Sequence, residues 1–321
     1  MGSWANSTDQ IYVPTPGRFS TRVTIGSLAA IACFIGIIGN FLVLLSEWKR
    51  CLGSKSQVRL FERPLTMYFV NSLAITDVCN SVINIPLFVI NMFQEFLVYK
   101  VGCLAYSVTL FTFPAVTILN LLVISIERYM AIFFPHKAPD RRASRKLVIG
   151  AWIVGTSIGI LTTLTMDIVR YDIDDTKYAL TCTYDKNKPW KNCLYTVLAI
   201  LVFFPPSVVM FYTASRTVSF LRKRKRQIIQ GKLRQSCNKR SRSFADTRLL
   251  MNIVFAFIVP YSLFFIYNTI KTFAKVELNF QDDYTIRIMS ALTALSNSAI
   301  NPIIYVHGSR RIRRGIANLF R

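Results

Sequence analysis

A glutamate and an arginine stand side by side at positions 127 and 128, directly after 26 residues without a charge, Val101 to Ile126. A charged side chain in lipid costs at least about 2.5 kcal/mol. The two residues must therefore lie at a membrane edge, face protein or have a function there. Adjacent helical residues point about 100° apart, so Glu127 can pair with Arg128 and release it when a partner enters. An idle arginine that extends to the membrane surface is the alternative.

The pair belongs to a chain with the composition of an integral membrane protein. Of its 321 residues 52% are hydrophobic and 17% are charged, and the mean hydropathy is +0.38. Seven apolar windows are long enough to cross a bilayer core of about 30 Å as helices: 23–45, 67–93, 101–126, 147–166, 192–215, 249–270 and 288–309. Asp77 is the one charged residue inside these windows. We predict an all-α integral membrane fold, a seven-transmembrane helix bundle over residues 21–309. The predicted spans are about 21–47, 65–93, 101–134, 146–167, 192–220, 245–271 and 284–307.

Lysine and arginine counts predict how the bundle is oriented. The connections 46–66, 136–146, 216–248 and 310–321 hold 27 basic and four acidic residues, whereas the N-terminus and the other connections hold 11 and ten. Basic connections face the cytoplasm, so we expect a multi-pass plasma-membrane protein whose N-terminus, residues 1–20, is extracellular. Basic runs such as 222–226 then contact inner-leaflet lipids rather than nucleic acid.

The last residues, 310–321, are predicted to form a short amphipathic helix on the cytoplasmic side, after the seventh span. Ile312 and Ile316, with Leu319 or Phe320, recur at helical spacing among four arginines. A helix of this kind lies on the inner membrane face.

Three cysteines fall on the predicted outer side, where oxidation is allowed. Cys103 begins the third span, Cys182 lies in the loop between spans four and five, and Cys193 follows that loop. One bridge from Cys103 would tie the loop to the bundle, and both other cysteines are candidates for it. Asn6, in the triplet "NST", is the single glycosylation acceptor pattern and lies on the same side.

Several residues inside the spans have a mechanical meaning. Prolines such as Pro260 remove a backbone hydrogen bond and allow a helix to bend. Asp77 at mid-membrane needs polar neighbours or a cation. The residues that could supply that company are Asn40, Thr117, Asn297, Ser298 and Asn301. Any one of these alone could simply join two helices by hydrogen bonds.

Taken in order along the chain, these features resemble the rhodopsin-like (class A) G-protein-coupled receptors over about residues 21–320. The markers are the "GN" ending at Asn40, "LAITD" ending at Asp77, Cys103 twenty-five residues before Arg128, "ERY", Pro135, Trp152, Pro260 and "NPIIY".

The resemblance implies roles for individual residues. The expected G-protein coupling and activation residues are Glu127, Arg128, Tyr129, Pro135, Pro260, Asn301, Pro302 and Tyr305. Asp77 with Thr117, Asn297, Ser298 and Asn301 is similar to the family's sodium pocket, so a sodium ion is expected there as an allosteric modulator, and no other cofactor or metal is expected. Cys103 and Cys182 are similar to its outer disulfide.

The chain departs from the family pattern in the sixth span and after the third. Phe257 and Ile258 replace the usual Cys-Trp before Pro260, and Arg240 replaces an acid that often binds the arginine of the third span. The resting state should then be weakly held, which predicts ligand-independent signalling. His136 replaces an aliphatic residue that contacts G proteins, so the coupling partner is left open.

The resemblance also places a ligand pocket between the outer halves of the helices. Its expected lining residues are Leu110, Phe111, Pro114, Tyr261, Ser262, Phe265, Arg287 and Ala291. Leu110 occupies the position of the aspartate that amine receptors use, which argues against a monoamine. The second outer loop is acidic, with Asp172, Asp174, Asp175 and Asp185, and acidic loops attract cationic ligands. We therefore favour a peptide ligand, with lipids and small neutral molecules as alternatives.

Three functions other than that of a G-protein-coupled receptor are alternatives for such a chain. An enzyme is not expected, because the two histidines, His136 and His307, lie near the cytoplasmic face and no nucleophile–base pair or phosphate loop is present. A transporter or channel should carry charges deep in several spans, and inside the seven apolar windows only Asp77 is found. A receptor-like protein that signals without G proteins, or as the partner of another receptor, stays open as the runner-up.

Overall fold

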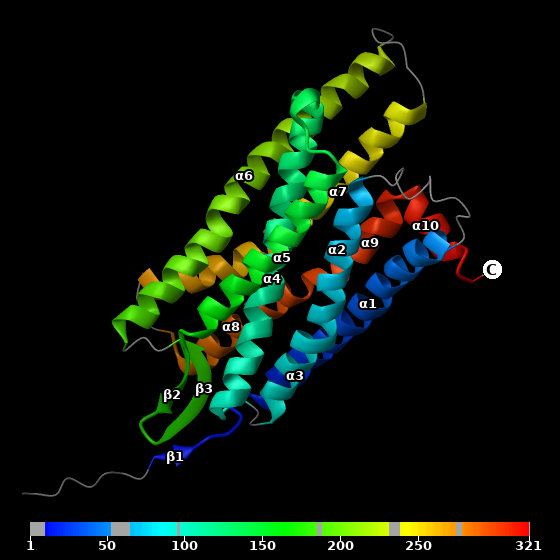
Figure 1. The fold of residues 1–321 in the computed structure, drawn as a ribbon. Coiled ribbons are helices and arrows are strands. Elements are labelled where there is room, and N and C mark those ends of the chain that lie inside the picture. Colours follow the sequence, from blue (N-terminus) through cyan, green and yellow to red (C-terminus); the bar gives the residue numbers. More distant parts are fainter. Residues whose placement is uncertain are drawn as a thin grey trace, which may run out of the picture.

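The computed structural model describes residues 10–52, 65–94, 97–184, 188–230, 238–273 and 278–320. Its helices lie side by side in one elongated bundle, with a small sheet at one end and the C-terminal helix at the other (Figure 1). In chain order the elements are β1 (Ile11–Tyr12), α1 (Phe19–Leu52), α2 (Leu65–Cys79), η2 (Asn80–Asn84), α3 (Ile85–Phe93), α4 (Lys100–Phe133), η3 (Pro135–Lys137), α5 (Arg141–Thr163), β2 (Met166–Asp174), β3 (Lys177–Tyr184), α6 (Pro189–Ile229), α7 (Asn238–Phe273), α8 (Phe280–Leu295), α9 (Asn297–Gly308) and α10 (Arg310–Ala317).

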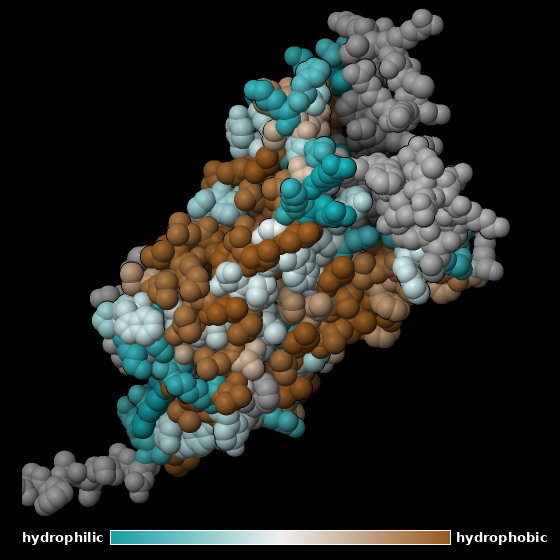
Figure 2. Space-filling model, in the orientation of Figure 1, coloured by the Kyte–Doolittle hydropathy of each residue, from teal (hydrophilic) through white to brown (hydrophobic). Residues whose placement is uncertain are grey.

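Within the described residues, six helical segments are long and apolar enough to cross a membrane. They are Phe19–Lys49, Tyr68–Phe93, Lys100–Phe133, Arg142–Thr163, Pro189–Arg224 and Arg248–Lys271. The second of these runs through α2, η2 and α3, because the chain passes through one wide turn before Pro86. The space-filling view shows hydrophobic residues over the middle of the visible face and hydrophilic ones at both ends (Figure 2). This pattern suits a protein whose middle faces lipid.

The seventh crossing is divided, whereas the sequence predicted one continuous span over 284–307. α8 has 16 residues and α9 has 12, and the two meet at Ser296. The turn is tight there, because the Ala299 amide donates to the Ser296 carbonyl (2.9 Å) three residues back. Each half is too short to span a bilayer alone, but together they complete the bundle.

Side chains from a neighbouring helix satisfy the carbonyls that this break and Pro302 leave free. Proline has no N–H for the carbonyl four residues back, and here that carbonyl of Ser298 accepts from the Asn40 amide at 2.9 Å. The Leu295 carbonyl accepts from the Asn80 amide at 3.3 Å. Buried polar groups without partners are costly, so these asparagines hold α1 and η2 against the seventh crossing.

A three-stranded sheet covers one end of the bundle and was not part of the all-α prediction. β2 and β3 form an antiparallel hairpin, and β1 pairs in parallel with β3, Ile11 opposite Lys177 and Tyr12 opposite Tyr178. The fourth predicted span, 146–167, accordingly ends earlier, since α5 stops at Thr163 and β2 begins at Met166. Strong alternation in "RYDID" fits a strand with one covered face.

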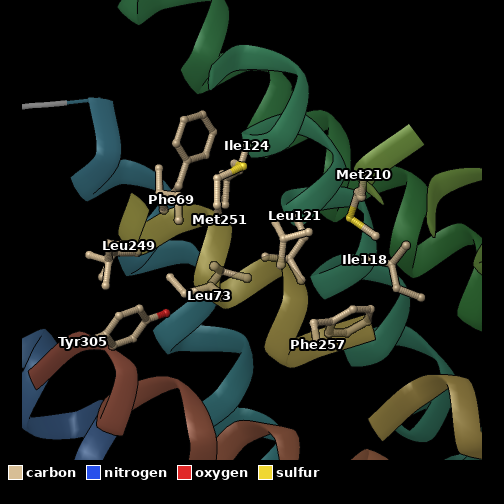
Figure 3. Packing of buried hydrophobic residues seen from close by; sticks show 14 of the residues in the cluster. Phe69, Leu73, Ile118, Leu121, Ile124, Met210, Leu249, Met251, Phe257 and Tyr305 are labelled. Carbon is tan, nitrogen blue, oxygen red and sulfur yellow. The ribbon is translucent and has the colours of Figure 1, made fainter. Parts of the chain in front are cut away.

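The hydrophobic core lies between α2, α4, α6, α7 and α9. Phe69, Leu73, Leu121, Phe257 and Tyr305 are among its fully buried side chains (Figure 3). α10 docks on the end of this core, because Ile312 is completely buried and Ile316 packs beside it. The predicted amphipathic helix therefore rests part of its apolar face on protein rather than on lipid alone.

Candidate functional site

The Glu127–Arg128 pair lies buried near the end of α4 that is opposite the sheet. Glu127 is 2% exposed and Arg128 is 8% exposed. The guanidinium donates through Nη2 to one carboxylate oxygen of Glu127 at 2.6 Å and through Nε to the other. This two-point geometry is the strong form of an arginine–carboxylate contact. Removing one partner of such a pair is strongly destabilising, because it leaves the other charge buried without compensation.

The other predicted coupling residues surround this end of the bundle. The ring of Tyr129 packs at a tilt against Phe133, with ring centroids 4.7 Å apart, and its centroid lies 6.3 Å from that of Tyr212 of α6. Pro135 begins the exposed turn η3, which also exposes His136. Tyr305 is fully buried, its hydroxyl has no hydrogen-bond partner, and its ring points into the core (Figure 3). Pro260 lies inside α7, and the side chain of Arg240 is outside the described residues.

A second cluster of buried polar residues lies at mid-bundle around Asp77, which is 2% exposed. The Asn301 amide donates to the Asp77 carboxylate at 2.8 Å, and the Asn80 amide donates to the Ser298 hydroxyl at 2.9 Å. The side-chain amide of the predicted Asn40 donates to the backbone carbonyl of Ser298, as described above.

Two predicted members of this cluster have different contacts. The Thr117 hydroxyl donates to the Thr76 hydroxyl at 3.4 Å, one residue before Asp77. Asn297 is buried with its amide oxygen unpaired, as is the amide oxygen of Asn301. Oxygen atoms of carboxylates, amides and hydroxyls are the ligands that hard cations take. The oxygen atoms gathered around Asp77 thus fit a small cation.

Asn80 and Asn84 also belong to this cluster, although their sequence context did not single them out. The Asn84 amide donates to the side-chain oxygen of Asn80 at 2.9 Å and to the Thr109 carbonyl at 3.2 Å. Two asparagines four residues apart in an apolar window lie on one helix face. That spacing was the signal that could have placed both in the polar cluster.

The opposite half of the bundle encloses a cavity of about 300 Å³ under the hairpin. Helices α3, α4, α6, α7 and α8 line its walls, β3 lies across it, and Pro14 and Pro16 of the N-terminal segment complete the cover. The predicted residues that line it are Leu110, Phe111, Pro114, Tyr261, Phe265, Arg287 and Ala291. Ser262 does not line it, because its hydroxyl turns back to the Ile258 carbonyl of its own helix at 2.6 Å.

Tyr184 and Tyr195, which the sequence did not single out, line this cavity together with the predicted Phe265 and Tyr261. Phe265 stacks on Phe203 of α6, with centroids 4.1 Å apart, and Tyr184 stacks on Tyr195 at the same distance. At its floor Tyr261 stacks on Phe257 at 4.2 Å. Phe257, which stands where the family usually has a cysteine, thus places a ring beside Tyr261, one turn further along α7.

The hairpin is tied to the bundle by one disulfide. Cys103 of α4 bonds to Cys182 of β3, with Cα atoms 5.5 Å apart, and Cys193 is a free, exposed thiol. The bridge closes a loop between residues 79 apart in sequence. Of the two partners left open for Cys103, the structure selects Cys182.

The acidity of the hairpin is partly neutralised within it. Asp172 pairs with Arg170 at 3.0 Å. Asp174 accepts from the hydroxyl and the amide of Thr176, and these hydrogen bonds, together with Lys177, lower the pKa of its carboxyl. Asp175 lies on the exposed turn and Asp185 is outside the described residues, as is the candidate glycosylation residue Asn6.

A membrane bundle of seven crossings, with a cavity at one end and a buried ion pair at the other, has the architecture of a transmembrane receptor. The chain belongs to the 7 transmembrane receptor (rhodopsin family), whose family model matches residues 56–305. It is therefore a G-protein-coupled receptor and not an enzyme, as its motifs predicted.

Individual relatives agree with this assignment. Neuromedin-U receptor 2 of Mus musculus is 25% identical over 338 residues, covering 98% of this chain and 80% of that receptor. The neuropeptide S receptor of Macaca mulatta is 27% identical over 281 residues, 84% of this chain and 72% of its own. The histamine H2 receptor of Cavia porcellus is 25% identical over 307 residues, 93% of this chain and 80% of its own.

Proposed function

We propose that this receptor lies in the plasma membrane with its N-terminus outside, binds a peptide through the cavity under the hairpin, and signals to a heterotrimeric G protein through Arg128. The observation that carries the proposal is the separation of two sites along one bundle. The cavity lies beneath the disulfide-linked hairpin, whereas the Glu127–Arg128 pair lies near the other end of α4.

The mechanism follows from the two arrangements that such a bundle can adopt. In the arrangement that the structure has, the carboxylate of Glu127 pairs with the guanidinium of Arg128, and the core around Tyr305 is tightly packed. A ligand that binds the open arrangement better shifts the population toward it. The coupling is typically about 1–3 kcal/mol and is reciprocal, so a bound G protein should raise agonist affinity.

Two observations support a peptide over an amine. The relatives include receptors named for neuromedin U and neuropeptide S, although one is named for histamine. Amine recognition needs an acid in the pocket, and no acidic residue is among the described residues that line this cavity.

The coupling site is tested by nucleotide exchange on purified G proteins of several classes, added to membranes that contain the receptor. We expect Arg128→Ala to abolish the agonist response, and Glu127→Gln to raise exchange without ligand because the released guanidinium becomes available. Arg170→Gln, on the hairpin, is the matched control and should change neither. An Arg128→Ala receptor with normal exchange would contradict the proposal and favour signalling without G proteins.

We also propose that Asp77, Ser298 and Asn301 bind a sodium ion, with Thr117 and Asn297 close by. The unpaired oxygens of Asn297 and Asn301 support this, and the ion would offset the buried charge of Asp77 and hold α2 to α9. Sodium chloride should raise the thermal unfolding midpoint of the purified receptor relative to choline chloride at equal ionic strength. Asp77→Asn should remove that difference, and a difference that persists in this variant would exclude the site.

A further inference from the structure

Arg287 of α8 is the one charged residue among the described residues that line the outer cavity. The rest of the lining is apolar or aromatic, with neutral polar groups such as Ser107 and Asn268. A single cation in such a wall acts at low local dielectric, where electrostatic contacts are stronger than in water.

The guanidinium of Arg287 lies near two aromatic rings and has no anionic partner among the described residues. Its Cζ lies 6.0 Å from the ring centroid of Tyr171 and 5.9 Å from that of Tyr284. Its Nε is buried and makes no hydrogen bond. Among the described residues, no carboxylate lies within 4.0 Å of it.

The nearest acid along the helix is already occupied by other donors. Asp283, one turn earlier on α8, forms an ion pair with Lys271 of α7. Its carboxylate also accepts from the Tyr267 hydroxyl at 2.5 Å and from the Tyr171 hydroxyl at 3.3 Å. Lys271 and Asp283 balance each other, so the charge of Arg287 is left in excess at the cavity.

We propose that Arg287 binds the carboxylate of a ligand whose adjoining part is apolar, an inference that rests on the proposed use of this cavity for the ligand. A guanidinium binds a carboxylate through two parallel hydrogen bonds. At about 300 Å³ the cavity is at the small end of ligand pockets. It therefore suits the last residues of a peptide with a free C-terminus, or the chain of a fatty acid, rather than a whole peptide.

The two sources of a carboxylate are separated by probes in matched pairs. The first pair is the tetrapeptide acetyl-Phe-Leu-Val-Phe as free acid and as C-terminal amide. The second pair is dodecanoic acid and its methyl ester. Binding is measured as the shift of the thermal unfolding midpoint of the purified receptor in nanodiscs over a concentration series.

In the unmodified receptor we expect one acid to bind about 10- to 100-fold more tightly than its neutral analogue, the range for a hydrogen bond to a charged group. Arg287→Gln should remove this preference, Arg287→Lys should retain part of it, and Arg170→Gln should leave it intact. Arg170 is the matched control because it is a hairpin arginine that pairs with Asp172 and does not line the cavity.

The inference is overturned if no acid binds, if acid and neutral analogue bind equally, or if Arg287→Gln keeps the preference. The comparison of acid with neutral analogue on the unmodified receptor stands even if a variant fails to fold. The measurement contains no G protein, so a failure of G-protein activation would count against the proposed function and not against this inference.

Discussion

At the scale of single residues, polar side chains fix the alignment of neighbouring helices in this receptor. Contacts between apolar side chains do not specify that alignment alone. Asn40, Asn80 and Asn84 each donate to a carbonyl or side chain on another part of the bundle. Interhelical hydrogen bonds of this kind contribute roughly 0.6 kcal/mol each in membranes. Their main effect is directional, because each works only with its helices in one register.

Asp167 provides a residue-scale prediction outside the membrane. It is the second residue of β2 and accepts from Lys191 at 3.0 Å and Lys188 at 3.1 Å. The hydrogen bond from Lys191, against the opposing effect of burial and with help from Lys188, lowers the pKa of Asp167 from 3.8 to about 2. A pKa that is lower in the folded state stabilises the protein at pH above the unfolded value, and the gain is lost as pH falls from about 4 toward 2.

We therefore expect Asp167→Asn to lower the thermal unfolding midpoint at pH 7 and to lower it much less near pH 2, measured by tryptophan fluorescence on the purified receptor. The matched control is Asp175→Asn, on the exposed turn of the hairpin. If the difference in unfolding midpoint between Asp167→Asn and the unmodified receptor stays constant across this pH range, the ion pairs of Asp167 are not the cause of that difference.

At the scale of elements, the N-terminal segment adds a strand to the hairpin and covers the cavity. The amides of Ile11 and Val13 donate to the Thr176 and Tyr178 carbonyls at 2.7 and 2.8 Å. The chain then turns at Gly17, whose φ of 95° is in the region that favours glycine. A side chain at Gly17 would also meet the ring of Tyr284.

Gly17→Ala should therefore loosen this cover by about 1–2 kcal/mol, the cost of a left-handed residue with a Cβ. The amides of residues 11–13 should exchange hydrogen roughly 10-fold faster, as measured by mass spectrometry of the N-terminal peptide. Gly150→Ala is the control, since a Cβ at Gly150 meets nothing within 4 Å. Unchanged exchange in Gly17→Ala would mean that the turn does not hold the strand in place.

At the scale of the whole molecule, the charge asymmetry predicts orientation. Epitope tags joined to the two ends of the chain test it in cells. The N-terminal tag should be stained on intact cells and the C-terminal tag only after permeabilisation, because the basic connections remain in the cytoplasm. The reverse pattern would place Arg128 outside and remove the basis for G-protein coupling.

Much of the architecture could be read from the sequence because lipid imposes a simple rule. Each apolar window had to form a helix to satisfy its backbone hydrogen bonds. The family markers at Asp77, Arg128 and Pro302 located the buried polar cluster and the predicted G-protein end of the bundle. Exposed and partly covered residues alternate over 170–174, and the matching polar–apolar alternation of residue types could have suggested the first strand of the hairpin. The division of the seventh span at Ser296 had no comparable signal, because it depends on partners in other helices.

The sequence by itself determined the membrane class, the number of crossings and the family, since these depend on composition, length and local motifs. Only the tertiary structure decided which cysteine joins Cys103, which side chains enclose the outer cavity, and that Asp283 is taken by Lys271 and leaves Arg287 without a carboxylate. The reason is physical: charge pairing and cavity lining depend on distances between residues far apart in the chain, and those distances are set by how the helices pack.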